Sequence, residues 1–233
     1  MYAIAAAEIR MLFRNRTVAL SALVVPVAFA AVFIVLDAYG STGALASVVV
    51  VTIMAMGTYV TATTTLAARR QALWLKRLRG GTVTDAGVLA GLVGPVAAVT
   101  LLQLAVVLTV LAVRDAPAQA GLVVVALLAT EAMFVGLALA TSAVTSSGEH
   151  AQYTTLPLFF AALGASVWFQ LTGVDEWIWV KRVLPGGSTA ELVQGAWDGG
   201  DLSAAPALVG ISLAWAVVGA VAGLRAFRWE PRH

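Results

Sequence analysis

Residues 68–85 read ARRQALWLKRLRGGTVTD and interrupt a chain that is otherwise strongly apolar. They hold five of the fourteen basic residues, and long runs with almost no charge lie on both sides. The five are Arg69, Arg70, Lys76, Arg77 and Arg79. Short loops rich in lysine and arginine stay on the cytoplasmic side of a membrane. This stretch therefore predicts a cytoplasmic loop between two membrane-spanning helices.

The composition of the 233 residues agrees with a polytopic membrane protein. Apolar residues make up 61% and charged residues 11%, whereas a soluble domain carries about 25% charged residues. The pI near 9.3 does not indicate a nucleic-acid partner, because the basic residues flank apolar runs instead of forming one patch. The absence of cysteine excludes disulfides and thiolate metal sites. We therefore expect an all-α membrane protein.

Six apolar segments are long enough to cross a bilayer as helices. They are residues 17–37, 44–67, 87–113, 119–143, 152–172 and 203–225. With a cytoplasmic N-terminus, eleven of the fourteen basic residues lie inside, and only Arg114, Lys181 and Arg182 lie outside. An odd number of spans would place the basic residues after the last span outside. The simplest topology therefore has six spans with both termini in the cytoplasm.

Two segments outside these spans carry their own predictions. Residues 1–16 mix arginine with apolar side chains, which predicts a helix in the cytoplasmic interface before the six-span domain of residues 17–233. The alternative is a soluble extension of the first span. The outer segment, residues 173–202, contains Trp177, Trp179 and Pro185. Tryptophan prefers the headgroup level, and the apolar pieces are too short to span, so we expect short re-entrant or interfacial helices.

Glu131 is the one acid deep within a predicted span. An ionised carboxylate at the bilayer centre costs roughly 2.5–3.5 kcal/mol on insertion scales. The residue therefore either lines a polar path or relays a proton, or it bonds a neighbouring helix, for example at Gln103. Thr58 and Thr61 belong to a threonine-rich second span that is a candidate for the same path. Threonine hydroxyls also bond back to their own helix carbonyls, which requires no function.

Catalytic motifs are missing from the sequence. No Gly-x-x-x-x-Gly-Lys-Ser/Thr loop is present, and the only lysines are Lys76 and Lys181, so the chain is not expected to bind ATP itself. No His-Glu-x-x-His pair, paired intramembrane aspartates or Ser-His-Asp set is visible. We expect no catalytic residue, metal or cofactor in this chain. The alternatives to a transport subunit are a membrane channel or scaffold protein and, less favoured, an intramembrane enzyme.

Two short motifs carry a resemblance to a known family. The first is LKRLRGGT at residues 75–82, and the second is Val183-Leu184-Pro185 before the last span. In this order, with the six spans, they resemble the permease subunits of type 2 ABC transporters (ABC-2-like), in particular the daunorubicin-resistance type of drug exporter. The chain departs from the family pattern at four places: Gln71 stands for Glu, Leu73 for Gly, Trp74 for Thr, and Gly81-Thr82 for Thr-Pro.

The resemblance implies a coupling helix at Trp74–Arg79, within a coupling loop of residues 68–86, that docks on a separate ATPase. The expected coupling residues are Arg69, Arg70, Trp74, Leu75, Lys76, Arg77, Leu78 and Arg79. Two permease subunits, identical or paralogous, would each dock one ATPase subunit, which binds ATP and Mg. The complex would sit among the lipids of a bacterial inner membrane as a multi-pass protein. It would export an amphipathic drug-like or lipid-like substrate and so confer multidrug resistance.

Overall fold

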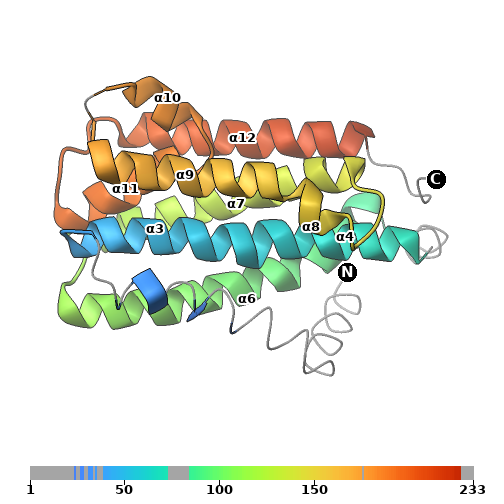
Figure 1. The fold of residues 1–233 in the computed structure, drawn as a ribbon, viewed down its shortest axis with the longest axis horizontal. Helices are drawn as coiled ribbons and strands as arrows, with labels where there is room; N and C mark the ends of the chain where they lie inside the picture. The colour runs from blue at the N-terminus through green and yellow to red at the C-terminus, as the bar shows by residue number, and fades with distance from the viewer. Residues whose placement is uncertain are drawn as a thin grey trace.

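The computed structural model describes residues 39–72, 84–174 and 176–226, together with a few separate positions between residues 24 and 35. Within these ranges every regular element is helical. Five of the described helices are long and apolar enough to cross a membrane, which is compatible with a multi-pass membrane protein. They lie roughly side by side along the long axis of the molecule (Figure 1).

The central helix is a continuous segment of 30 residues, Thr42–Gln71. It consists of α3 (Thr42–Met54), the π-helix η1 (Ala55–Val60) and α4 (Thr61–Gln71). Its most apolar stretch is 89% buried, compared with 22% for the last helix. The chain is apolar almost all round in α3, which suits a helix surrounded by protein. This helix is therefore the most buried of the long helices in the described ranges.

Four further long helical segments complete the bundle: the first three contact the central helix, and the last packs on the segment Ala120–Val144. They are α6 (Asp85–Arg114), α7 (Ala120–Val144), α8 with α9 (Ala151–Thr154 and Leu156–Thr172), and α12 (Ala205–Ala226). With the central helix they confirm, as helices, the predicted segments 44–67, 87–113, 119–143, 152–172 and 203–225, to within four residues at each end. Pro157 occupies the first turn of α9, where its missing N–H costs nothing, and α6 continues through Pro95.

The contact between α7 and α12 depends on glycine. A Cβ atom at Gly219 would lie 2.5 Å from the Gly136 carbonyl carbon, and one at Gly223 would lie 2.7 Å from the Leu139 carbonyl carbon. A Cβ at Gly136 would in turn clash with the backbone of Ala216. Small residues four positions apart let helix backbones approach closely. The Gly219-x-x-x-Gly223 spacing therefore sets how closely these two helices pack.

Two short helices precede the last long one, as predicted for residues 173–202. They are α10 (Ile178–Val183) and α11 (Gly187–Asp198). Gly186 joins them with φ of +92°, and its backbone lies against Ala162 of α9, so a side chain there would be both strained and blocked. One face of α11 is buried against α3, α7, α9 and α12. The placement of α10 and α11 relative to a membrane remains a prediction.

Several predictions concern residues that the structure does not describe. They are the interfacial helix at residues 1–16, most of the first span at 17–37, the coupling residues Trp74, Leu75, Lys76, Arg77, Leu78 and Arg79, and the chain after residue 226. The number of spans, the cytoplasmic position of both termini and the coupling helix therefore stay predictions.

Candidate functional site

A buried hydrogen bond joins the central helix to α7 near the middle of the bundle. The Thr58 hydroxyl donates to Glu131 Oε1 at 2.6 Å. Thr58 is fully buried and Glu131 is 6% exposed. The second carboxyl oxygen, Oε2, has no hydrogen-bond partner among the described residues. Because a buried polar atom without a partner is costly, this oxygen is a position where a proton or a ligand group would bind.

Thr58 differs from the other threonines of the central helix. Thr52, Thr63 and Thr64 donate to the carbonyl four residues earlier, and Thr61 donates to the Met56 carbonyl five residues earlier. The hydroxyls of these residues, including the path candidate Thr61, therefore bond carbonyls of their own helix, an arrangement that requires no function. Thr58 instead lies within the π-helix η1 and reaches across to α7. Single π-turns inside α-helices are frequent at functional sites.

Two further hydroxyl pairs involve Tyr59 and Thr130, the sequence neighbours of Thr58 and Glu131. The Tyr59 and Thr141 hydroxyls are 3.1 Å apart, and those of Thr130 and Thr189 are 2.9 Å apart. The second pair connects the residue before Glu131 to the buried first turn of α11. In each pair one hydroxyl donates and the other accepts, and either hydroxyl can take either role. Thr58 of η1, Thr130 and Glu131 of α7, and Thr189 of α11 thus form a buried polar cluster within an apolar core.

Gln103, named above as an example of a possible partner for Glu131, lies on α6 with 8% of its surface exposed. The hydrogen bond that the structure gives Glu131 comes from Thr58 instead. Helix α6 approaches η1 at Gly57, the residue before Thr58, since a Cβ at Gly57 would lie 2.7 Å from Thr100 Oγ1. Gly57 therefore lets α6 pack directly against the π-helix.

The two described basic residues of the candidate coupling set differ in environment. Arg69 is half-buried in the last turn of α4, and Arg70 is fully buried. Arg70 Nη1 donates to the Ser142 carbonyl at 3.0 Å, and Nη2 donates to the Thr145 carbonyl. Both carbonyls lie at the C-terminal end of α7, where helix carbonyls lack helical partners and the dipole is negative. The sequence led us to expect Arg70 as a residue that docks on a partner. In the structure its guanidinium is buried inside the bundle and bonds α7.

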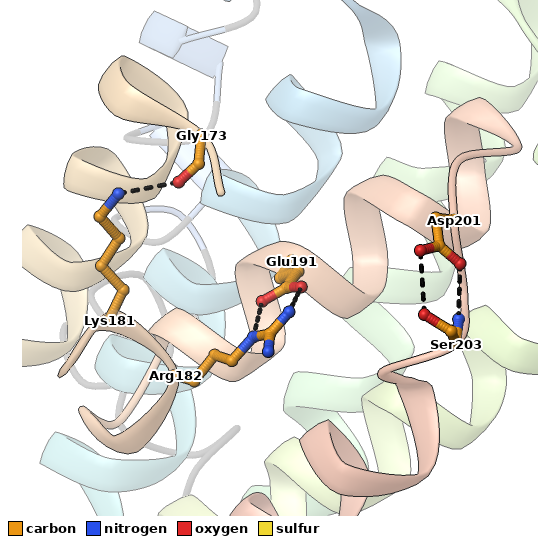
Figure 2. A network of polar contacts seen from close by, with 6 residues as sticks. All are labelled: Gly173, Lys181, Arg182, Glu191, Asp201 and Ser203. Carbon is orange, nitrogen blue, oxygen red and sulfur yellow. Dashed lines mark hydrogen bonds and ion pairs between the residues drawn. The ribbon is translucent and has the colours of Figure 1, made fainter. Parts of the chain in front are cut away.

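The opposite end of the bundle holds the outer segment, whose polar contacts Figure 2 shows. Lys181 is fully buried, and its Nζ donates to the Gly173 carbonyl at 2.8 Å. Arg182 makes a two-pronged ion pair with Glu191, through Nε at 2.7 Å and Nη2 at 2.5 Å. The hydrogen bonds to Glu191 raise the pKa of Arg182, and burial opposes this shift. These contacts tie α10 to α9 and to α11.

The tryptophans of the outer segment fall into two classes. Trp177 and Trp179 are 69% and 67% exposed, and the Arg182 guanidinium lies over the Trp179 ring, 5.2 Å from its centre. Trp197 is 2% exposed and donates to the Asp115 carbonyl at 3.1 Å. Pro185, the third predicted residue, is buried in the link between α10 and α11. The exposed pair suits a headgroup environment, whereas Trp197 holds the end of α11 in place.

Two aspartates organise helix starts at the same end. Asp198 accepts from the Gly43 amide at 2.9 Å and from the Ser41 hydroxyl at 2.6 Å, so the end of α11 caps the start of α3. Asp201 accepts from both the amide and the hydroxyl of Ser203 at 2.9 Å, just before α12. These bonds, the amide first, hold the pKa of Asp201 below its usual value.

A cavity of about 340 Å³ opens between the start of α3, the end of α9 and α11. Its polar lining comes from Tyr39, Ser41, Gln170 and Gln194. Gln170 Nε2 donates to the Ser47 hydroxyl at 2.8 Å, and burial raises the pKa of Tyr39. The cavity therefore offers neutral hydrogen-bonding groups at the end of the bundle that holds residues 173–202.

The described ranges hold no group of three or more His, Asp or Glu side chains that could hold a metal ion. The sequence reasoning missed the Asp198 cap, the Arg182–Glu191 pair and the α7–α12 glycines. The last of these had a readable signal in the Gly219-x-x-x-Gly223 spacing, whereas the first two join residues that only the fold brings together.

Comparison of the chain with protein-family models, with curated proteins and with solved structures found no match.

Proposed function

We propose that the chain is the membrane-spanning permease subunit of an ATP-driven exporter of the ABC type. The observation that carries the proposal is the position of the basic segment. The helix Thr42–Gln71 is the most buried long helix described, and in the sequence it leads directly into residues 69–79, the most basic stretch of the chain. A partner that moves this segment would act on the most buried helix of the bundle.

The energy source in this proposal is a separate subunit. The sequence contains no nucleotide-binding loop, so ATP and Mg would be bound by two copies of an ATPase partner. A second permease subunit, identical or paralogous, would complete the complex. The exposed apolar faces of α6 and α12 would meet lipid or that second subunit. These faces include Leu102, Val106, Val110, Val217, Val218 and Val221.

The substrate in this proposal is amphipathic, either drug-like or lipid-like. The walls of the bundle are rich in alanine, valine and leucine, and the polar groups at mid-depth are few. Thr58 and Glu131 would provide the polar contacts along the path, with Gln103 on the neighbouring α6. The cavity at Tyr39, Gln170 and Gln194 would lie at its outer end.

Co-purification tests the proposal directly. The chain is expressed with candidate ABC ATPases, and the complex is reconstituted in proteoliposomes. We expect ATP hydrolysis that depends on the chain and ATP-driven movement of an amphipathic dye. Leu75→Asp together with Leu78→Asp should abolish both, because a charged pair would disrupt an apolar docking face.

The matched control is Gln152→Asp, which adds a negative charge at an exposed position of α8 outside the basic segment. This variant should hydrolyse ATP and move dye like the unaltered chain. Failure of every ATPase to associate with the chain would contradict the proposal and favour a channel or scaffold protein.

A further inference from the structure

The side chain of Arg70 ends inside the bundle, although the residue belongs to the basic stretch of the chain. It is 0% exposed, and its guanidinium bonds two main-chain carbonyls of α7, those of Ser142 and Thr145. A guanidinium presents several donors in a fixed, planar arrangement, which suits two carbonyls at one helix end. Burying this charge is costly unless such bonds compensate it, so the contact is a specific attachment.

The same end of α4 is also packed against the link that follows α7. A Cβ atom at Gly148 would lie 3.1 Å from the Ala68 Cβ and 3.8 Å from the Thr64 carbonyl oxygen. The link is ordered by its own bonds: the Thr145 and Thr154 hydroxyls are 2.9 Å apart. The inner ends of α4 and α7 are therefore joined both by Arg70 and by direct backbone packing.

A second attachment between the same helices lies higher in the bundle. Thr58 bonds Glu131 at 2.6 Å, and Glu131 precedes Ser142 by about three turns of α7. The Tyr59 hydroxyl, 3.1 Å from that of Thr141, instead meets α7 beside Ser142, at the Arg70 end. Thr58 and Arg70 are separated by about 18 Å along a helix that rises 1.5 Å per residue. Two attachments at different heights prevent one helix from sliding or tilting against the other, whereas a single attachment would act as a pivot.

Helix α7 passes this constraint on to α12. The backbones of the two helices meet at Gly136 and Gly219, and again at Leu139 and Gly223. Where two backbones touch, no flexible side chain lies between them to absorb a displacement. Packed interiors also deform little, so movement of α7 displaces α12. The central helix, α7 and α12 are therefore linked in series from the inner end of α4.

We propose that Arg70 is a positioning residue that makes the central helix and α7 move as one body, so that a displacement at the inner end of α4 reaches α7 and α12. This inference rests on the proposed function, in which an ATPase supplies the displacement. It gives Arg70 a role different from docking: the residue transmits movement and does not touch the ATPase.

Two variants and one control separate this role from a purely structural one. Arg70→Gln removes the charge and one arm of the fork, and Arg70→Lys keeps the charge but replaces the fork with a single ammonium group. We expect Arg70→Gln to lower the amount of substrate moved per ATP by on the order of tenfold, a common size for coupling between sites, with ATPase binding unchanged. Arg70→Lys should move an amount of substrate per ATP between those of Arg70→Gln and the unaltered chain. Arg225→Gln, which removes an exposed charge at the inner end of α12, should match the unaltered chain.

A covalent link provides the rescue. The chain contains no cysteine, so Ala68→Cys with Gly148→Cys creates a single disulfide, and neighbouring Cβ atoms at this spacing need only small adjustment to form one. The oxidised pair should restore coupling in the Arg70→Gln chain, and reduction should remove it again. In the chain that keeps Arg70, oxidation should leave transport unchanged, because the two segments do not separate during the cycle.

The outcomes are distinguishable from failure of the proposed function. If the unaltered chain binds no ATPase and moves no substrate, the proposed function fails. If the unaltered chain is coupled and Arg70→Gln is coupled equally well, or if the oxidised pair blocks transport in the chain that keeps Arg70, only the role of Arg70 is overturned. Spin-label distances between α4 and α7 in the full chain alone give a check without the ATPase: Arg70→Gln should broaden them, and an unchanged distribution would contradict the attachment.

Discussion

The Thr58 hydroxyl and the Glu131 carboxyl form a buried hydrogen bond of 2.6 Å between the central helix and α7. Thr58 is the one threonine among those with hydroxyl bonds described in this helix whose hydroxyl leaves its own backbone to reach another helix. It does so within the π-helix η1. The bond leaves Glu131 Oε2 without a hydrogen-bond partner among the described residues.

The Thr58–Glu131 bond predicts a large difference between two threonine substitutions. Thr58→Val should lower the free energy of unfolding by about 1–3 kcal/mol, because the carboxyl loses its donor in a buried site. Thr58→Ser keeps the donor and should change it little. Thr52→Val is the control and should cost less than about 1 kcal/mol, since it removes only a bond within one helix. Reversible unfolding in mixed micelles measures all three, and equal losses at positions 52 and 58 would contradict a special role for Thr58.

The α7–α12 contact predicts opposite effects for two glycines in the same helix. Gly219→Ala should destabilise the protein by about 1–3 kcal/mol, because its Cβ would lie 2.5 Å from the Gly136 carbonyl carbon. Gly210→Ala meets no atom within 4 Å and should stabilise it by about 0.5–1 kcal/mol through its higher helix propensity. Thermal unfolding of the two variants measures the difference. A neutral Gly219→Ala would show that the helices do not pack through this glycine.

The long helices were predictable because each is specified by the length of an apolar run. The structure confirms the predicted segments 44–67, 87–113, 119–143, 152–172 and 203–225 as helices. Their order in space was not predictable, because the apolar residues surround each helix and no polar face marks the outside. The burial of the second segment, which reaches 89%, therefore emerged only from the fold.

The candidate site was predictable in its parts but not in its connections. Glu131 was identifiable as an isolated acid in an apolar run, but the residue that bonds it, Thr58, was not, and Gln103 was only one example of a possible partner. Thr58 resembled five neighbouring threonines, and only the π-turn distinguishes it. Arg70 belongs by sequence to the basic stretch, and its burial depends on the C-terminal end of α7, 72 residues further along the chain.

The cap between α11 and α3 predicts a further stability effect. Asp198→Ala should cost about 0.5–2 kcal/mol, the range for losing a helix cap, because the Gly43 amide and the Ser41 hydroxyl lose their acceptor. Asp198→Asn keeps an acceptor oxygen and should cost less. Hydrogen exchange at the Gly43 amide reports the loss locally. Unchanged protection of that amide in Asp198→Ala would contradict the cap.

The carboxyl of Asp201 predicts a pH dependence at the start of α12. Its folded pKa lies below the ordinary value of 3.8 because the Ser203 amide and hydroxyl donate to it. A lowered folded pKa contributes stability that is fully present above 3.8 and is lost as the pH falls through the lower folded value. Carboxyl carbon NMR should give a midpoint below 3.8. Ser203→Ala should raise this midpoint only part of the way towards 3.8, since the hydrogen bond from the Ser203 amide remains. A midpoint that does not move would show that the Ser203 hydroxyl does not lower the pKa of Asp201.

The most direct test of the account asks what the basic segment touches. Because the chain has no cysteine, Arg77→Cys places one thiol in the segment and Trp179→Cys places one at the exposed outer end. Each variant is treated with a thiol cross-linker in membranes that contain the ATPase. If the basic segment docks on the ATPase, position 77 captures the ATPase and position 179 does not. Capture from position 179, or an active complex in which position 77 captures nothing, would contradict it.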